Sequence, residues 1–132
     1  EQLHEVLPQA DWLILCCPAS PVTRGIANAA AFAAMPAGAH FVNVARGGVV
    51  DTDALVRHVS SGRLRAALDV TDPEPLPDGH PLWSAKNVLI TPHTADTKEM
   101  VLAMFSMRIK ANVLALQGLG PWVGQVDAEL GY

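Results

Sequence analysis

The 132-residue sequence predicts an α/β fold, a doubly wound parallel sheet with flanking helices. The first observation behind this prediction is a set of short apolar runs, each bounded by Pro, Gly, Asp or Asn. These runs lie at residues 12–17, 40–45, 66–70 and 87–91. The second observation is that segments with helical signals alternate with the runs. Short, continuously apolar runs are typical of strands buried on both faces, as in a parallel sheet.

Helices are predicted over residues 28–35, 51–61 and 97–117. Asp51 is a suitable N-cap for the second helix, and Gly62 follows its end. Asp96 can cap the third helix, with Glu99 in a capping-box position. Apolar residues recur every three or four positions along this last helix, which predicts that one face packs into a core. These positions are Met100, Met104, Met107, Ala111 and Leu114.

Residues 71–84 contain four prolines and are predicted to form a long ordered loop, without a helix or an inner strand. Long loops in compact domains are often functional. Ligands of parallel α/β sheets bind outside the carboxyl ends of the strands. The residues that directly follow the apolar runs are therefore the first candidates for a site.

Composition narrows the classes of partner. The net charge of −4 argues against a nucleic-acid partner, which usually meets a basic face, and no cluster of Lys and Arg predicts a membrane surface. No apolar stretch approaches the roughly 20 residues of a membrane-spanning helix. Cys16 and Cys17 are adjacent and lack the spacing of a metal or redox motif. We therefore expect no metal, buried thiols, and a reducing compartment such as the cytoplasm.

Three side chains near the expected strand ends could form one catalytic site. Arg46 precedes two glycines, and its guanidinium is suited to holding a carboxylate through two hydrogen bonds. His93 could exchange a proton with a hydroxyl. Glu74 lies between two prolines, and a carboxylate beside an imidazole favours its protonated form. Taken singly, the three could instead be a surface ion pair, a structural histidine and a solvated loop charge.

Several segments together resemble the D-isomer-specific 2-hydroxyacid dehydrogenase family. They agree with the family in order and spacing over nearly the whole chain. The matching segments are 43–51 (NVARGGVVD), 67–70 (ALDV), 72–77 (DPEPLP), 80–83 (HPLW), 87–93 (NVLITPH), and 10–18 with Thr23. The resemblance implies a Rossmann-like sheet whose first βαβ unit is absent, since the glycine-rich turn that cradles a pyrophosphate does not occur.

The resemblance also implies roles for single residues. Arg46 would bind the carboxylate of a 2-oxo or 2-hydroxy acid, His93 would be the general acid and base, and Glu74 would be its paired carboxylate. Asp69 resembles the residue that contacts the nicotinamide amide. The cofactor would be NAD, with NADP as an alternative. Its binding site would be lined by Pro18, Thr23, Ala45, Arg46, Asp69, His93 and Ala95.

The family pattern leads to the expectation that this chain is the back of a larger enzyme, cut before Glu1. Residues 1–117 would be the last part of the dinucleotide-binding domain, and 118–132 would return to the substrate domain. The full-length protein would be a homodimer. Asp96 stands where many members have a small residue, so it could affect the cofactor instead of capping a helix. A cofactor-sensing binding protein and an inactive truncated product remain alternatives to the enzyme.

Overall fold

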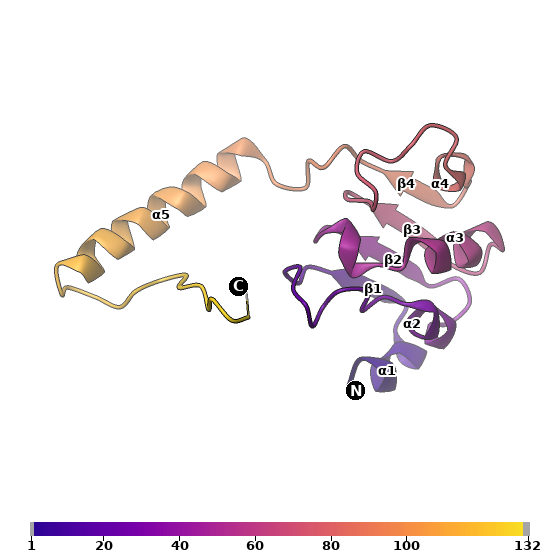
Figure 1. The fold of residues 1–132 in the computed structure, drawn as a ribbon, viewed down its shortest axis with the longest axis horizontal. Coiled ribbons are helices and arrows are strands. Elements are labelled where there is room, and N and C mark those ends of the chain that lie inside the picture. Colours follow the sequence, from indigo (N-terminus) through magenta and orange to yellow (C-terminus); the bar gives the residue numbers. More distant parts are fainter. Residues whose placement is uncertain (1, 131–132) are drawn as a thin grey trace. The chain divides into compact units, whose positions relative to one another are not determined.

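The described part of the chain contains four strands, which form one parallel sheet in the order β1-β2-β3-β4 (Figure 1). The strands are β1 (Trp12–Leu15), β2 (His40–Asn43), β3 (Arg65–Leu68) and β4 (Val88–Ile90). This computed structural model describes residues 2–130, and the chain divides into two compact units, Glu1–His93 and Thr94–Tyr132. The sheet lies in the first unit. The predicted fold class is therefore confirmed, with each strand shorter than its apolar run.

The strands end together at one edge of the sheet. Leu15 pairs with Asn43, Asn43 with Leu68, and Leu68 with Ile90. Because all pairs are parallel, the loops after β2, β3 and β4 begin side by side at this edge. The register thus brings together the three loops that carry the candidate residues.

The helices of the first unit begin where polar side chains can cap them. α2 (Ala29–Ala34) follows Asn28, whose side chain accepts a hydrogen bond from the Ala31 amide at 3.0 Å. α3 (Thr52–Ser60) follows Asp51, which accepts from the Ala54 amide at 2.9 Å. These two predictions are confirmed to within a residue or two. Short 3-10 turns, η1 (Leu7–Gln9) and η2 (Gly47–Val49), complete the connections.

Two helices were not predicted. α1 (Gln2–Val6) precedes the sheet, and α4 (Pro81–Ser84) lies within the proline-rich loop. Pro81 occupies the first turn of α4, where its missing N–H costs nothing, and the His80 ring nitrogen accepts a hydrogen bond from the Leu82 amide. The expectation of a helix-free loop was therefore wrong for its last turn.

The core lies between the sheet and the helices. Phe32 of α2 meets Phe41 of β2 edge to face, with ring centroids 5.1 Å apart, and both side chains are fully buried. The alternate positions of the strands are much more open: Trp12 and Ile14 of β1 and Leu89 of β4 are each more than half exposed. The expectation that the strands are buried on both faces is thus wrong for these positions. A short apolar run shows that a strand is buried, but it does not show what covers each face.

The second unit consists of one long helix and the segment that follows it. α5 (Lys98–Leu116) is capped by Thr97, whose hydroxyl accepts a hydrogen bond from the Met100 amide at 3.2 Å, so the expected cap at Asp96 was wrong. After Gly118 the chain returns along α5. The Asn112 side chain pairs with both backbone groups of Val123, at 2.9 and 3.1 Å. None of the described helices has the length and apolar character needed to cross a membrane.

The predicted core face of α5 is largely exposed in this structure. Met100, Met104 and Met107 are each more than half exposed, and Ala115 is the buried residue of the helix. The helix was predicted to within a residue at each end, but its apolar residues do not gather on one buried face. The division expected at residues 117 and 118 stays a prediction, and residues 131–132 of the expected tail lie outside the described residues.

Arg63 fastens the end of α2 to the loop before β3. Its guanidinium donates hydrogen bonds to the carbonyls of Phe32 at 2.6 Å, Ala33 at 2.8 Å, and Met35. These carbonyls lie in the last turn of α2 and at its end, where a helix has no further N–H donors of its own. One side chain therefore satisfies several backbone groups at once.

We expect Arg63→Met to lower the free energy of unfolding by about 2–3 kcal/mol, because charged hydrogen bonds to partly buried carbonyls are lost. Urea unfolding would measure this. Arg65→Met is the matched control, since this side chain is exposed at the start of β3. Equal effects of the two substitutions would contradict the role given to Arg63.

His58 should make stability depend on pH. Burial lowers the pKa of His58 below its ordinary value of 6.5, and the charges of Arg63 and Arg57 lower it further. The unfolded chain therefore binds this proton more readily than the folded one. The contribution of the neutral His58 ring to the free energy of unfolding is complete above pH 6.5 and is lost as the pH falls below that value.

Compared with the unsubstituted chain, His58→Gln should accordingly lose less stability between pH 8 and pH 5.5, measured by urea unfolding at both pH values. His4→Gln, an exposed change on α1, is the control. An identical pH dependence in His58→Gln and the unsubstituted chain would argue against this linkage.

Candidate functional site

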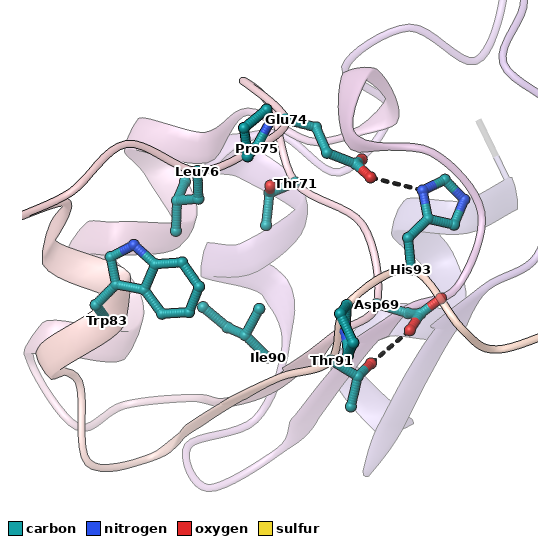
Figure 2. A pocket seen from close by; sticks show the side chains of 10 residues that line it. Asp69, Thr71, Glu74, Pro75, Leu76, Trp83, Ile90, Thr91 and His93 are labelled. Atoms are coloured by element: carbon teal, nitrogen blue, oxygen red, sulfur yellow. Dashed lines mark hydrogen bonds and ion pairs between the residues drawn. The ribbon is translucent and has the colours of Figure 1, made fainter.

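His93 and Glu74 form a hydrogen-bonded pair at the carboxyl edge of the sheet. His93 Nδ1 lies 2.6 Å from Glu74 Oε1 (Figure 2). His93 follows β4, and its backbone has a φ of 55°, in the left-handed region that non-glycine residues rarely occupy. Glu74 stands between Pro73 and Pro75, each preceded by a cis peptide bond. The two side chains that the sequence placed 19 positions apart are therefore in direct contact.

A pocket of about 430 Å³ adjoins this pair. Figure 2 shows Glu74 and His93 on one side of it and Leu76, Trp83 and Ile90 on the other. Asp69, Thr71 and Thr91 contribute polar groups to its lining. Binding sites for small molecules commonly combine an apolar wall with a few convergent polar groups. The pair is itself accessible, since the His93 side chain is 47% exposed and that of Glu74 is 39% exposed.

Asp69 is a buried carboxylate at the end of β3, only 7% exposed. The Thr91 hydroxyl donates a hydrogen bond to Asp69 Oδ1 at 2.5 Å. The backbone amide of Asp69 donates to the Asn43 carbonyl at 3.0 Å. Thr91 precedes Pro92 and His93, so its contact with Asp69 also ties the histidine loop to β3. A fixed carboxylate at the strand ends suits the carboxamide of a nicotinamide ring, which presents an N–H₂ donor. The residues present thus fit the cofactor that the resemblance implies.

Arg46 is exposed and does not line this pocket. Its guanidinium donates to the carbonyl of the preceding residue, Ala45, at 2.6 Å. The loop that carries it is nevertheless joined to the loop that carries Glu74. The Thr52 hydroxyl donates to the Asp72 carbonyl at 2.9 Å, and Gly47 lies against the backbone of Thr71. The contact of Arg46 with a substrate carboxylate stays a prediction.

The remaining predicted cofactor residues lie in different settings. Thr23 and Pro18 belong to one turn, in which the Thr23 hydroxyl donates to the Pro18 carbonyl at 2.7 Å and accepts from the Ser20 amide at 2.8 Å. Ala45 is buried next to Arg46. Ala95 belongs to the second unit. Their cofactor contacts stay predictions.

The cysteines depart from the expectation of buried thiols. Cys16 is exposed and Cys17 is half-buried, because β1 ends at Leu15 and the chain leaves the sheet there. Both are free. Over the described residues, no group of three or more His, Cys, Asp or Glu side chains is arranged to hold a metal ion.

Sequence reasoning missed the part that Asn43 and Thr91 play in the site, and it noted Gly47 only as a glycine that follows Arg46. Asn43 is fully buried, and a polar residue inside an apolar run was the signal that could have identified it. Gly47 has no room for a side chain, since a Cβ would lie 1.9 Å from the Thr71 carbonyl oxygen. Contacts of this kind join segments distant in sequence, so local pattern does not reveal them.

Comparison with known proteins identifies the kind of domain. The family model described as "D-isomer specific 2-hydroxyacid dehydrogenase, NAD binding domain" matches residues 1–95. The chain is 39% identical to the human glyoxylate reductase/hydroxypyruvate reductase over 84% of the chain and 34% of that protein. It is 41% identical to glyoxylate/hydroxypyruvate reductase A of Serratia proteamaculans, over the whole chain and 42% of that protein. The chain therefore spans less than half the length of these relatives.

Solved structures agree with this assignment. A D-isomer specific 2-hydroxyacid dehydrogenase from Xanthobacter autotrophicus Py2, in complex with NADPH and MES, matches with a TM-score of 0.83 and 41% identity, over 97% of this chain and 42% of that one. An NADPH-dependent glyoxylate/hydroxypyruvate reductase from Sinorhizobium meliloti, in complex with NADP and sulfate, matches with a TM-score of 0.85 and 34% identity. This second match covers 98% of this chain and 42% of that one.

Gly47→Ala should separate the Arg46 loop from the Glu74 loop, because the new methyl group would meet backbone atoms of Thr71 at 1.9 and 2.2 Å. We expect a loss of about 1–3 kcal/mol or more in the free energy of unfolding. Gly48→Ala is a matched control one residue away, where the nearest atom is a carboxylate oxygen of Asp72 at 3.9 Å. If urea unfolding found both variants equally stable, the close approach at Gly47 would not matter.

Proposed function

Because the chain belongs to the D-isomer specific 2-hydroxyacid dehydrogenase family, we propose that it is part of an NAD(P)-dependent oxidoreductase that interconverts 2-oxo acids and D-2-hydroxy acids. The observation that carries the proposal is the His93–Glu74 pair at the mouth of a pocket on the carboxyl edge of the sheet. A hydrogen-bonded imidazole and carboxylate beside a cleft suit proton transfer to a substrate oxygen.

The chain's own side chains would divide the work in the following way. The Arg46 guanidinium binds the substrate carboxylate, a planar acceptor that fits its donors. Glu74 holds His93 Nδ1, so the other ring nitrogen, Nε2, gives a proton to the carbonyl oxygen during reduction and takes it back during oxidation. Glu74 also stabilises the imidazolium while the proton is held. A bound NAD(P)H would supply the hydride for the carbonyl carbon.

Asp69, Thr23 and Pro18 are the residues proposed to line the nicotinamide side of the cofactor, together with Ala45, Arg46, His93 and Ala95. The support is the fixed carboxylate of Asp69 and the family match over residues 1–95. Either NAD or NADP is proposed. The two structural relatives named above bind NADPH or NADP, and the residues that discriminate the cofactors precede this part of the domain in the family.

Small 2-oxo acids are the proposed substrates. Two relatives that match the chain at 39% and 41% identity carry the names of glyoxylate and hydroxypyruvate reductases. We further propose a cytoplasmic location, supported by two free cysteines, and a homodimer as the full-length form. The exposed positions of the sheet, such as Trp12 and Ile14, leave apolar surface for further packing.

His93→Ala in the full-length protein should lower kcat by about 10²–10⁴-fold, because the general acid is removed. Glu74→Gln should have a smaller effect, since an amide oxygen still accepts from Nδ1. Steady-state reduction of glyoxylate and hydroxypyruvate would measure both. His4→Ala, an exposed change on α1, is the control. Unchanged turnover in His93→Ala would refute these roles.

Arg46→Gln should act mainly on binding. Loss of the paired, charged hydrogen bonds should raise the KM for the 2-oxo acid by about 100-fold. The measurement should be made with NADH and NADPH separately, over a panel of 2-oxo acids. Cofactor binding without turnover on any of them would instead favour a cofactor-sensing role.

A further inference from the structure

Asn43 is a buried polar side chain at the last position of β2. Its exposed fraction is 0%, and both ends of its amide are used. Oδ1 accepts a hydrogen bond from the Ala45 amide at 3.0 Å, and Nδ2 donates to the Arg46 carbonyl at 2.9 Å. An amide buried in this way is tolerated only when its hydrogen bonds are made. The side chain therefore has a structural task that an apolar residue cannot perform.

The two bonds lie on either side of Arg46. One fixes the peptide N–H of Ala45, and the other fixes the carbonyl of Arg46 itself. Between them the Arg46 backbone is extended, with φ −147° and ψ 153°, and η2 begins at the next residue. The direction in which the Arg46 side chain leaves the chain is set by these dihedrals. By fixing this backbone, Asn43 fixes the position and direction of the Cα–Cβ bond from which the Arg46 side chain extends.

Asn43 also reaches the neighbouring strand. Its backbone carbonyl accepts the Asp69 amide at 3.0 Å, so the Arg46 turn is held to the strand end that carries the buried carboxylate. An Asp at this position would keep the acceptor for Ala45 but would set a carboxylate oxygen against the Arg46 carbonyl. A Leu would fill the space and leave both backbone groups without their partner. To make both hydrogen bonds, the side chain at position 43 must carry a donor and an acceptor on one short planar group.

We propose that Asn43 is a positioning residue that holds Arg46 ready for the carboxylate of the substrate. The inference rests on the proposed function, in which Arg46 binds that carboxylate. Asn43 itself does not touch substrate or cofactor in this account. Its contribution reaches the reaction through the backbone of residues 45–46.

The chain offers a matched control at the opposite end of the sheet. Asn87, just before β4, also donates from its side chain to two backbone carbonyls, those of Val59 at 2.9 Å and Leu64. Replacing Asn87 therefore removes bonds of the same kind without touching the Arg46 turn. A general loss of stability would appear in Asn87→Ala as well as in Asn43→Ala.

The first experiment uses the full-length protein and steady-state kinetics on glyoxylate. Asn43→Ala should raise the KM by about tenfold or more with a smaller change in kcat, while Asn87→Ala leaves KM unchanged. In a double-mutant cycle with Arg46→Gln, adding Asn43→Ala should change KM by less than about threefold. The proposal would be overturned if the two substitutions multiplied each other's effect on KM in the double variant. An unchanged KM in Asn43→Ala would overturn it as well.

A second readout does not need turnover. Amide hydrogen exchange of Ala45 should be at least about tenfold faster in Asn43→Ala, unchanged in Asn87→Ala, and close to the unsubstituted rate in Asn43→Asp, which keeps the acceptor. Unchanged exchange in Asn43→Ala would overturn the positioning role. A full-length protein that reduces no 2-oxo acid would contradict the proposed function separately, and the exchange rates would still decide whether Asn43 holds the turn.

Discussion

The parallel ladder of the sheet does not stop where the strands end. The Val44 amide donates to the Leu15 carbonyl at 3.2 Å, the Asp69 amide to Asn43 at 3.0 Å, and the Thr91 amide to Leu68 at 2.9 Å. Each bond carries the strand pairing one residue into the loops. The first residue of each loop is therefore fixed by backbone hydrogen bonds. The positions of the side chains in the site depend first on this backbone geometry.

Side-chain hydrogen bonds further fix the loops that leave the sheet. The Asn43 side chain closes the turn that carries Arg46, and the Asp69 carboxylate joins its loop to Thr91. Thr52, the first residue of α3, is bonded to the Glu74 loop. Gly47 allows the Arg46 loop and the Glu74 loop to approach because it has no Cβ. The contacts of Asn43 and Asp69 are partly buried, where an unpaired polar group is costly. The arrangement that brings Glu74 to His93 is thus supported by other contacts.

Much of this fold follows from local sequence. The four strands, α2, α3 and the Asp51 cap could be predicted because alternation of apolar runs and capping residues is a local property. The His93–Glu74 contact could be anticipated because both residues follow strand ends. By contrast, burial on both faces of β1 and a buried methionine face on α5 were wrong. Periodicity identifies an apolar face, but the neighbour that covers it lies elsewhere in the chain or outside it. The position of Arg46 relative to a substrate likewise depends on more than local sequence, and it stays a prediction.

Trp83 gives this pocket an optical property. Its indole lines the same wall as Leu76 and Ile90, donates from Nε1 to the Pro77 carbonyl at 3.1 Å, and is about half exposed (Figure 2). The emission of an indole depends on the polarity around it, so a molecule that displaced solvent from this pocket would change the emission of Trp83. The other tryptophans are Trp12 on β1, which does not line this pocket, and Trp122, which belongs to the second unit. Replacing both would leave Trp83 as the one indole of the 132 residues, so tryptophan emission would report on the wall of this pocket.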